Sequence, residues 1–223
     1  MQAEKTKNYW NLKTNQKSQI VKPINKTSRI ELLSPAGNFD ALVAAVQNGA
    51  DAVYLGSKLF NARKLAGNFQ NDELRKAVQY AHLHGVKIYL TLNTLIKNNE
   101  ISAFLQQVSL AAQLHVDAII FQDLSFAKLI KEMFPELEIH ASTQATIMNS
   151  FSVDYWKKYV SVFVLARELS KKEVSEIHTK TNANLEIFIH GHLCISYSGQ
   201  CLISSLIGRR SGNRAWAGAG LPG

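Results

Sequence analysis

The side chains best able to do chemistry lie in one stretch near the C-terminal end of the sequence, residues 186–214. The two cysteines of the chain, Cys194 and Cys201, stand seven positions apart, and His190 shortly precedes them. Three arginines follow: Arg209, Arg210 and Arg214. Thiolates act as nucleophiles and metal ligands, and guanidinium groups bind phosphate. Ordinary buried thiols give the same pattern, so spacing alone leaves a metal site, a nucleophile and plain packing open.

Common hydrolase motifs are missing from the sequence. It contains neither a His-Glu-x-x-His zinc motif nor a Gly-x-Ser-x-Gly nucleophile elbow. A cysteine nucleophile at Cys194 beside His190 remains an alternative, but closeness in sequence is not the spatial pairing that such catalysis needs. The residue types therefore do not identify a catalytic residue.

The elements that must position these groups alternate regularly between strand and helix. Apolar runs predict strands at residues 30–34, 52–55, 86–92, 118–121, 138–141, 162–165 and 185–189. Helical spacing and capping signals predict helices at residues 39–47, 72–84, 101–114, 125–134, 152–159 and 170–180. Strands that alternate with helices form parallel sheets with right-handed crossovers. This favours an α/β fold, an incomplete (β/α) TIM-like barrel of about seven strands without its final strand, over a doubly wound sheet.

Polar side chains follow several of the predicted strands. In a barrel this end of the strands carries the active site, although such residues also serve as caps, turn formers or core histidines. We take the set as candidates for substrate binding: Asn93, His140, Gln144, Arg167, Glu168 and His190.

Charge and composition divide the chain into three parts. Residues 1–29 hold seven basic groups and one acidic group, which accounts for most of the net charge of +8. We predict a basic, disordered arm at 1–29, a barrel domain at 30–214, and an aberrant Ala/Gly-rich tail at 215–223. The sequence has no apolar run long enough to span a membrane and no leader pattern, and its two cysteines suit a reducing compartment, so we predict a cytoplasmic protein.

Several stretches together resemble the peptidase U32 family, also called the collagenase-like protease family. The similar stretches are residues 31–37, 49–56, 66–69, 139–144, 164–169 and 188–191, followed by Cys194 and by 197–201. Within that family the chain is most similar to the branch that forms 5-hydroxycytidine in 23S rRNA. This resemblance implies an RNA-modifying hydroxylase with RNA, rRNA or tRNA, as its partner. The alternatives are a collagenase-like peptidase, a hydroxylase of tRNA uridine, and an inert gene fragment.

The resemblance also implies a cofactor. Members of the family that carry out this chemistry are similar to iron–sulfur proteins with four cysteine ligands, and Cys194 and Cys201 match the first pair. The second pair is absent after Arg214, where the composition changes abruptly. We therefore expect a truncated chain that does not stably hold a [4Fe–4S] cluster by itself. Prephenate is the candidate oxygen donor, and the three arginines are candidates for phosphate contact.

Overall fold

The computed structural model describes residues 30–62, 67–191 and 194–201, and those from Glu31 onward belong to one unit. The predicted arm and tail lie outside the described residues, as do Arg209, Arg210 and Arg214. The account below concerns the described residues only.

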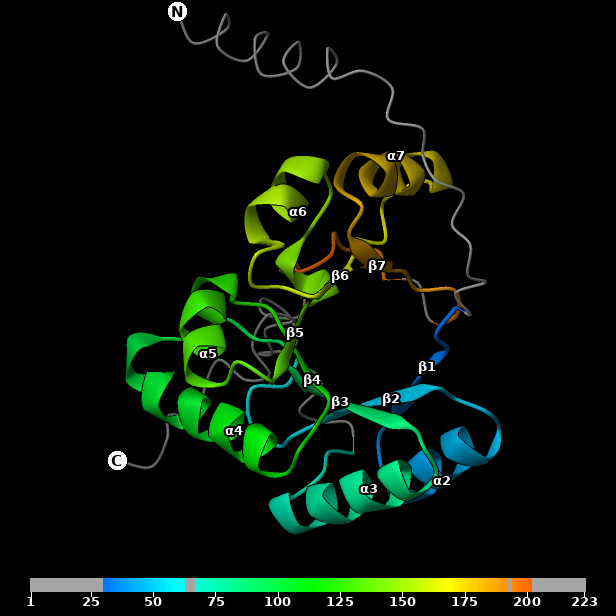
Figure 1. Cartoon of the computed structure of the whole chain (residues 1–223), viewed down its shortest axis with the longest axis vertical. Helices are drawn as coiled ribbons and strands as arrows, with labels where there is room; N and C mark the ends of the chain where they lie inside the picture. The colour runs from blue at the N-terminus through cyan, green and yellow to red at the C-terminus, as the bar shows by residue number, and fades with distance from the viewer. Residues whose placement is uncertain (1–29, 63–66, 192–193, 202–223) are drawn as a thin grey trace, which may run out of the picture. The chain divides into compact units, whose positions relative to one another are not determined.

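Seven parallel strands form one curled sheet in which every strand lies beside its neighbour in sequence (Figure 1). Their bounds are β1 (Leu33–Ala36), β2 (Ala52–Gly56), β3 (Lys87–Leu92), β4 (Ala118–Phe121), β5 (Glu138–Ala141), β6 (Val162–Val164) and β7 (Asn184–Glu186). All six neighbouring pairs are parallel, and β1 and β7 are the two edges. The predicted incomplete TIM-like barrel is confirmed.

The helices cover the outer face of this sheet (Figure 1). They are α2 (Phe39–Gln47), α3 (Asn71–Leu83), α4 (Ile101–Gln113), α5 (Ala127–Met133), α6 (Ser150–Trp156) and α7 (Lys171–Thr181), with short 3-10 turns η1 (Asn98–Glu100), η2 (Leu124–Phe126) and η3 (Thr143–Ala145). The predicted capping box at α7 is confirmed, because Ser170 Oγ accepts from Glu173 N and Ser170 N donates to the Glu173 carboxylate. None of the described helices is long and apolar enough to cross a membrane.

Strand alternation separates two layers of buried side chains. The larger core lies between sheet and helices and includes Leu42, Phe104 and Phe163, all fully buried. A smaller cluster on the inner face of the curled sheet includes Tyr89, Ile120 and Val164. The inner face is therefore where polar side chains of the strands can meet.

Both edge strands differ from the predicted ranges. The first strand is Leu33–Ala36 and so includes Pro35. Proline has no N–H to donate, and an edge strand tolerates this because one of its two sides forms no hydrogen bonds to another strand. The last strand is Asn184–Glu186, whereas the apolar side chains predicted to continue it, Ile187, Phe188 and Ile189, are exposed. Within the described residues nothing pairs with the outer edge of β7, so these side chains have no layer to pack against.

Candidate functional site

The segment that carries the cysteines is anchored by a buried turn at Ser198. Thr146, just after η3, donates its hydroxyl to Ser198 O at 2.7 Å. From the other side, Ser198 N donates to the Glu168 carboxylate at 2.9 Å. The turn therefore joins the loops that follow β5 and β6, at the end of the strands where barrels place their active sites.

Arg167 and Glu168 act together on this turn. The Arg167 Nε donates to Ser198 Oγ at 3.2 Å, and its Nη2 donates to Ser196 O at 3.1 Å. Burial alone would raise the pKa of the Glu168 carboxyl, but hydrogen bonds from its own backbone and from Ser198 bring that pKa below its ordinary value. The structure thus gives both predicted site residues a positioning role toward the cysteine segment.

Gly199 allows the turn to approach the strand ends closely. Its φ is +77°, and a Cβ at this position would lie 2.1 Å from Gln144 O. A side chain is excluded on both grounds. The same carbonyl accepts a hydrogen bond from Gln122 Nε2 at 3.1 Å, so Gln144 acts through its backbone and links the turn to the end of β4.

Two amide side chains stand next to each other at the strand ends. Leu92 pairs with Phe121 in the parallel register, so Asn93 and Gln122 are the next residues on neighbouring strands. Asn93 Oδ1 accepts from Ala62 N at 3.0 Å. Gln122 is buried, and its Oε1 has no hydrogen-bond partner among the described residues. A buried carbonyl without a partner is costly unless a ligand or water meets it. Gln122 is one of the polar residues that follow predicted strands, although it is not among the six candidates for substrate binding named from the sequence.

His140 lies apart from the Ser198 turn, within β5 on the inner face of the sheet. Its ring is fully buried against Tyr89, with ring centres 4.6 Å apart, and Nε2 lies 3.4 Å from the Glu138 carboxylate. Burial lowers the pKa of the imidazole, against the opposing effect of Glu138. Tyr89 in turn donates its hydroxyl to Glu31 at 2.6 Å. His140 therefore belongs to a polar cluster near the starts of the strands.

His190 and the cysteines form no closed site within the described residues. His190 and Cys194 are exposed, Cys201 is partly buried, and neither of these two cysteines is in a disulfide. No group of three or more His, Cys, Asp or Glu side chains that could hold a metal occurs there. A [4Fe–4S] cluster needs about four protein ligands, so the described residues do not form a complete cluster site.

Comparison with known proteins agrees with this architecture. Residues 37–216 match peptidase family U32. The chain is 36% identical to tRNA hydroxylation protein P1 of Bacillus subtilis, over 84% of this chain and 45% of that protein. It is 41% identical to the 23S rRNA 5-hydroxycytidine C2501 synthase of Escherichia coli, over 83% and 28%. It is 34% identical to a collagenase of Porphyromonas gingivalis, over 82% and 47%.

The chain spans half or less of the length of these curated relatives. Among solved structures, the U32 peptidase Mk0906 superposes with a TM-score of 0.62 at 15% identity, over 74% of this chain and 71% of that one. This likeness concerns the fold. The match over most of the sequence, together with relatives above 30% identity, shows that the chain belongs to peptidase family U32.

Proposed function

We propose that this chain is the barrel part of an RNA-modifying hydroxylase that acts on a pyrimidine base in the cytoplasm, with rRNA cytidine as the first candidate substrate and tRNA uridine as the second. The support from sequence is the similarity to relatives named for rRNA and tRNA hydroxylation. Because the chain spans only part of those relatives, the activity of the whole protein is part of the proposal.

The structural observation that carries the proposal is the unpaired Oε1 of Gln122. An enzyme that modifies a base must take it out of its stack and recognise its edge by hydrogen bonds. Cytosine offers an amino N–H and uracil an imino N–H, and an amide oxygen accepts from either. Gln122 Nε2 is already engaged by Gln144 O, so its Oε1 is held as an acceptor and not as a donor.

The Ser198 turn brings the thiol segment to the same end of the sheet. Gln144 O accepts the hydrogen bond from Gln122 Nε2 and also lies where a Cβ on residue 199 would stand. In this proposal the same carbonyl therefore orients Gln122 toward the base and allows only glycine in the turn of the thiol segment. In this proposal Arg167 and Glu168 fix the segment, while Gln122 and Asn93 face the base. His190 remains a candidate for substrate contact.

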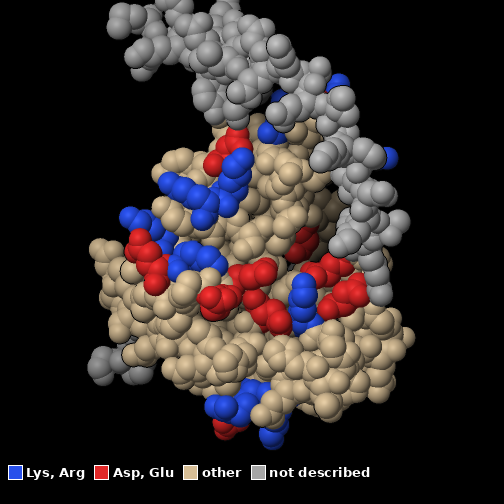
Figure 2. Space-filling model, in the orientation of Figure 1, with Lys and Arg blue, Asp and Glu red and all other residues tan. Residues whose placement is uncertain are grey.

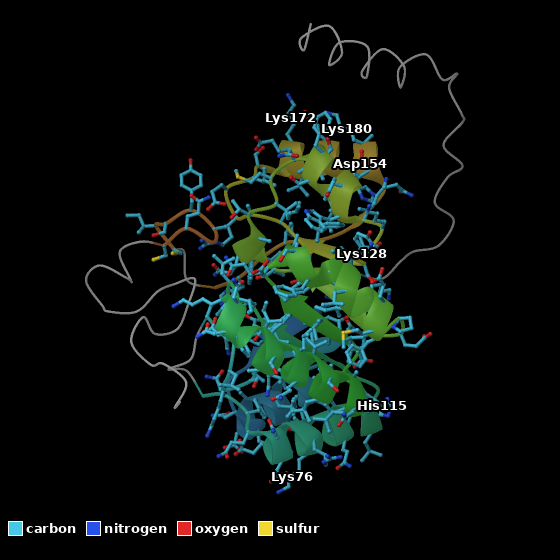
Figure 3. All side chains as sticks on the ribbon, turned by 90° about the vertical axis from the view of Figure 1, so that its left-hand side faces the viewer. Lys76, His115, Lys128, Asp154, Lys172 and Lys180 are labelled. Carbon is cyan, nitrogen blue, oxygen red and sulfur yellow. The ribbon has the colours of Figure 1, made fainter. Side chains whose placement is uncertain are left out.

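Phosphate contacts come from basic side chains away from the strand ends. Lys76, Lys128 and Lys172 lie on the outer helices (Figure 3). Contacts of this kind hold a polyanion without reading its sequence. The arginines proposed for phosphate contact, Arg209, Arg210 and Arg214, lie outside the described residues.

The proposed cofactor is a [4Fe–4S] cluster for which Cys194 and Cys201 provide two ligands. The described residues supply only this pair, so ligands from beyond them must complete the site. The cluster and prephenate, the candidate oxygen donor, remain proposals, and no step of the base recognition above depends on either.

The test is nucleoside mass spectrometry of rRNA and tRNA, digested separately, from cells with and without the gene that encodes this chain. We expect loss of 5-hydroxycytidine from rRNA or of 5-hydroxyuridine from tRNA, which identifies the substrate. Complementation with Gln122→Leu should restore little of the modification, whereas Glu176→Gln, on the exposed side of α7, should restore all of it. Unchanged amounts of both nucleosides after deletion would refute the proposal.

Peptidase activity is the second candidate, favoured by the similarity to the collagenase. The geometry offers it little, because no described histidine hydrogen-bonds a described cysteine or serine. Release of peptides from gelatin by the purified protein, abolished by Cys194→Ser, would establish this activity.

A further inference from the structure

A cavity of about 300 Å³ lies at the end of β2, apart from the contacts described above. Its walls are the residues that follow β2, the start of α3 and Gln107 of α4. In the parallel register Gly56 of β2 stands beside Thr91, two residues before Asn93. The loop after β2 also reaches Asn93, because Ala62 N donates to its Oδ1 at 3.0 Å. The cavity therefore lies at the same end of the sheet as the amides proposed to face the base.

Two oppositely charged side chains in this cavity are not paired with each other. Lys58 and Asp72 both line it, and the side chain of neither forms an ion pair or a hydrogen bond with a described residue. A ligand that is only anionic would be attracted by Lys58 and repelled by Asp72, and a cationic ligand would meet the reverse. The pair therefore suits a ligand with an anionic group at one place and an uncharged hydrogen-bond donor at another.

Neutral hydrogen-bonding groups and apolar surface complete the walls. Ser57 is buried and donates its hydroxyl to Gln107 Oε1 at 3.1 Å, which leaves the Nε2 of Gln107 as a donor. Leu59, which is 38% exposed, and Phe69 supply apolar surface. A few placed polar groups on an apolar wall are typical of a site for a small ligand. This combination of carboxylate, amide N–H and apolar wall suits a sugar ring with hydroxyl groups.

The charges of the described residues do not form a continuous basic surface on the face seen in Figure 2. Acidic side chains gather around a basic one in the middle of that face. A chain of phosphates would be repelled there, so we expect RNA to be held by cations without an acidic partner. Lys58 is one such cation, whereas Lys87 is paired with Glu31 at 2.8 Å. Unlike the lysines proposed on the outer helices, Lys58 stands beside a strand end.

We propose that this cavity binds one ribonucleotide next to the target base, with its phosphate at Lys58 and its 2′-hydroxyl donated to the Asp72 carboxylate; this rests on the proposed function, which makes RNA the substrate. A ribonucleotide carries one anionic group and uncharged O–H donors on a small ring, as the walls require. Enzymes that act on an extruded base also contact the flanking nucleotides. Because DNA lacks the 2′-hydroxyl, the cavity selects RNA over DNA.

The test compares a short labelled RNA of alternating cytidine and uridine with the DNA of the same base sequence. Fluorescence anisotropy gives the two affinities, and hydrogen exchange followed by mass spectrometry locates the contact. We expect the unmodified chain to bind the RNA at least about fivefold more tightly than the DNA, since one hydrogen bond to a charged group is lost with the 2′-hydroxyl. The RNA should slow exchange in residues 57–59 and 69–72 more than the DNA does.

The variant Asp72→Ala separates a lost hydroxyl contact from a general effect of charge. Removal of a carboxylate should by itself tighten the binding of any polyanion. RNA binding that weakens at least about threefold while DNA binding does not weaken therefore places the hydroxyl at Asp72. The matched control is Asp40→Ala, which removes an acid from the first turn of α2 outside the cavity and should leave the RNA preference unchanged. Lys58→Gln should weaken both strands alike and reduce the salt dependence by about one phosphate contact.

The outcomes distinguish this site from the proposed function. Equal binding of RNA and DNA, no binding of either, an RNA preference that survives Asp72→Ala, or slowed exchange at 57–59 with ribose 5-phosphate and not with RNA would each overturn the site. An RNA preference that depends on Asp72, together with unchanged nucleosides in cells without the gene, would support the site and refute the hydroxylase. The comparison of RNA with DNA and the exchange data stand on the unmodified protein even where a variant fails to fold.

Discussion

Glu186→Gln should stabilise the protein at alkaline pH. The Glu186 carboxyl has a pKa of about 7 in the folded protein, against an ordinary value of 4.5, because of burial first and of Glu31 second. Between these values the folded chain holds a proton that the unfolded chain has released, so rising pH lowers the free energy of unfolding. Glutamine resembles the protonated acid and does not ionise, so the variant avoids this loss.

The interval from 4.5 to about 7 corresponds to at most about 3.5 kcal/mol at about 1.4 kcal/mol per pH unit. Because Glu186 is only partly buried, water screens its charge, and we expect about 1–2 kcal/mol. The variant should be more stable than the unmodified protein by this amount at pH 8, and the difference should disappear below pH 5.

Urea unfolding followed by circular dichroism between pH 5 and 8 measures this difference. The effects of Glu31 and His140, whose pKa values lie below their ordinary values, favour the folded state as pH rises. They are common to both proteins and cancel to first order in the comparison. Glu176→Gln, whose carboxylate lies on the exposed side of α7, should change stability little at any pH. A pH profile of Glu186→Gln parallel to that of the unmodified protein would refute the reasoning.

Three further predictions concern the thiol segment. Gly199→Ala should lower the free energy of unfolding more than Gly85→Ala does and should speed proteolysis near residue 199. Both glycines have positive φ, which alone costs an alanine about 1 kcal/mol, but only a Cβ at 199 meets a neighbour, Gln144 O. Equal losses of stability in urea unfolding would contradict the close contact. Ser198→Ala should cost about 1–2 kcal/mol, since its hydroxyl contacts Arg167 and Glu168, whereas Ser175→Ala on α7 should cost under about 0.5 kcal/mol. After anaerobic reconstitution, iron analysis should find well below the four irons per chain of a full cluster; a full complement with a broad visible absorbance would show that this chain supplies a whole site.

The hydrophobic periodicity of the sequence was sufficient to predict the central strands and helices. Strands β2 to β5 are buried on both faces, and such strands appear as continuous apolar runs between turn signals. The helix Phe39–Gln47 has the predicted bounds because Asn38 caps its start and Asn48-Gly49 follow its end. Local chemistry determines these features, so the sequence reveals them.

The edges were less predictable, for a physical reason. An apolar run indicates a buried strand only if something covers it. The run at 185–189 satisfies the pattern, but pairing stops at Glu186 because within the described residues no strand lies beyond β7. The hydrophobicity of a segment shows that its burial would be favourable. Whether a neighbouring strand is there to bury it depends on the assembled sheet and not on the segment itself.

The sequence indicated where polar residues gather in the fold, but it did not indicate which role each of these residues has. Gln144, Arg167 and Glu168 all follow strands and all meet the turn at Ser198 and Gly199, because parallel strands end on the same side of a sheet, whereas their predicted role in substrate binding stays a prediction. Their contacts to Ser198 span 30 or more residues and depend on how the segment after β7 folds back. No local pattern encodes that return, so the sequence could not separate residues that face a substrate from residues that hold the thiol segment.

The carboxyl ends of the central strands and the two edges of the described sheet therefore differ in chemistry. At the carboxyl ends, the buried amide oxygen of Gln122 has no hydrogen-bond partner among the described residues, and in the proposed function it accepts a hydrogen bond from the edge of a base. At the edges of the described sheet, Glu31 precedes β1 and Glu186 is the last residue of β7, so both edges carry a carboxylate. Since an eighth strand would lie between β7 and β1, it would also cover the apolar side chains that follow Glu186. The proposed recognition of a base by Gln122 and the carboxylates at the sheet edges thus involve separate residues.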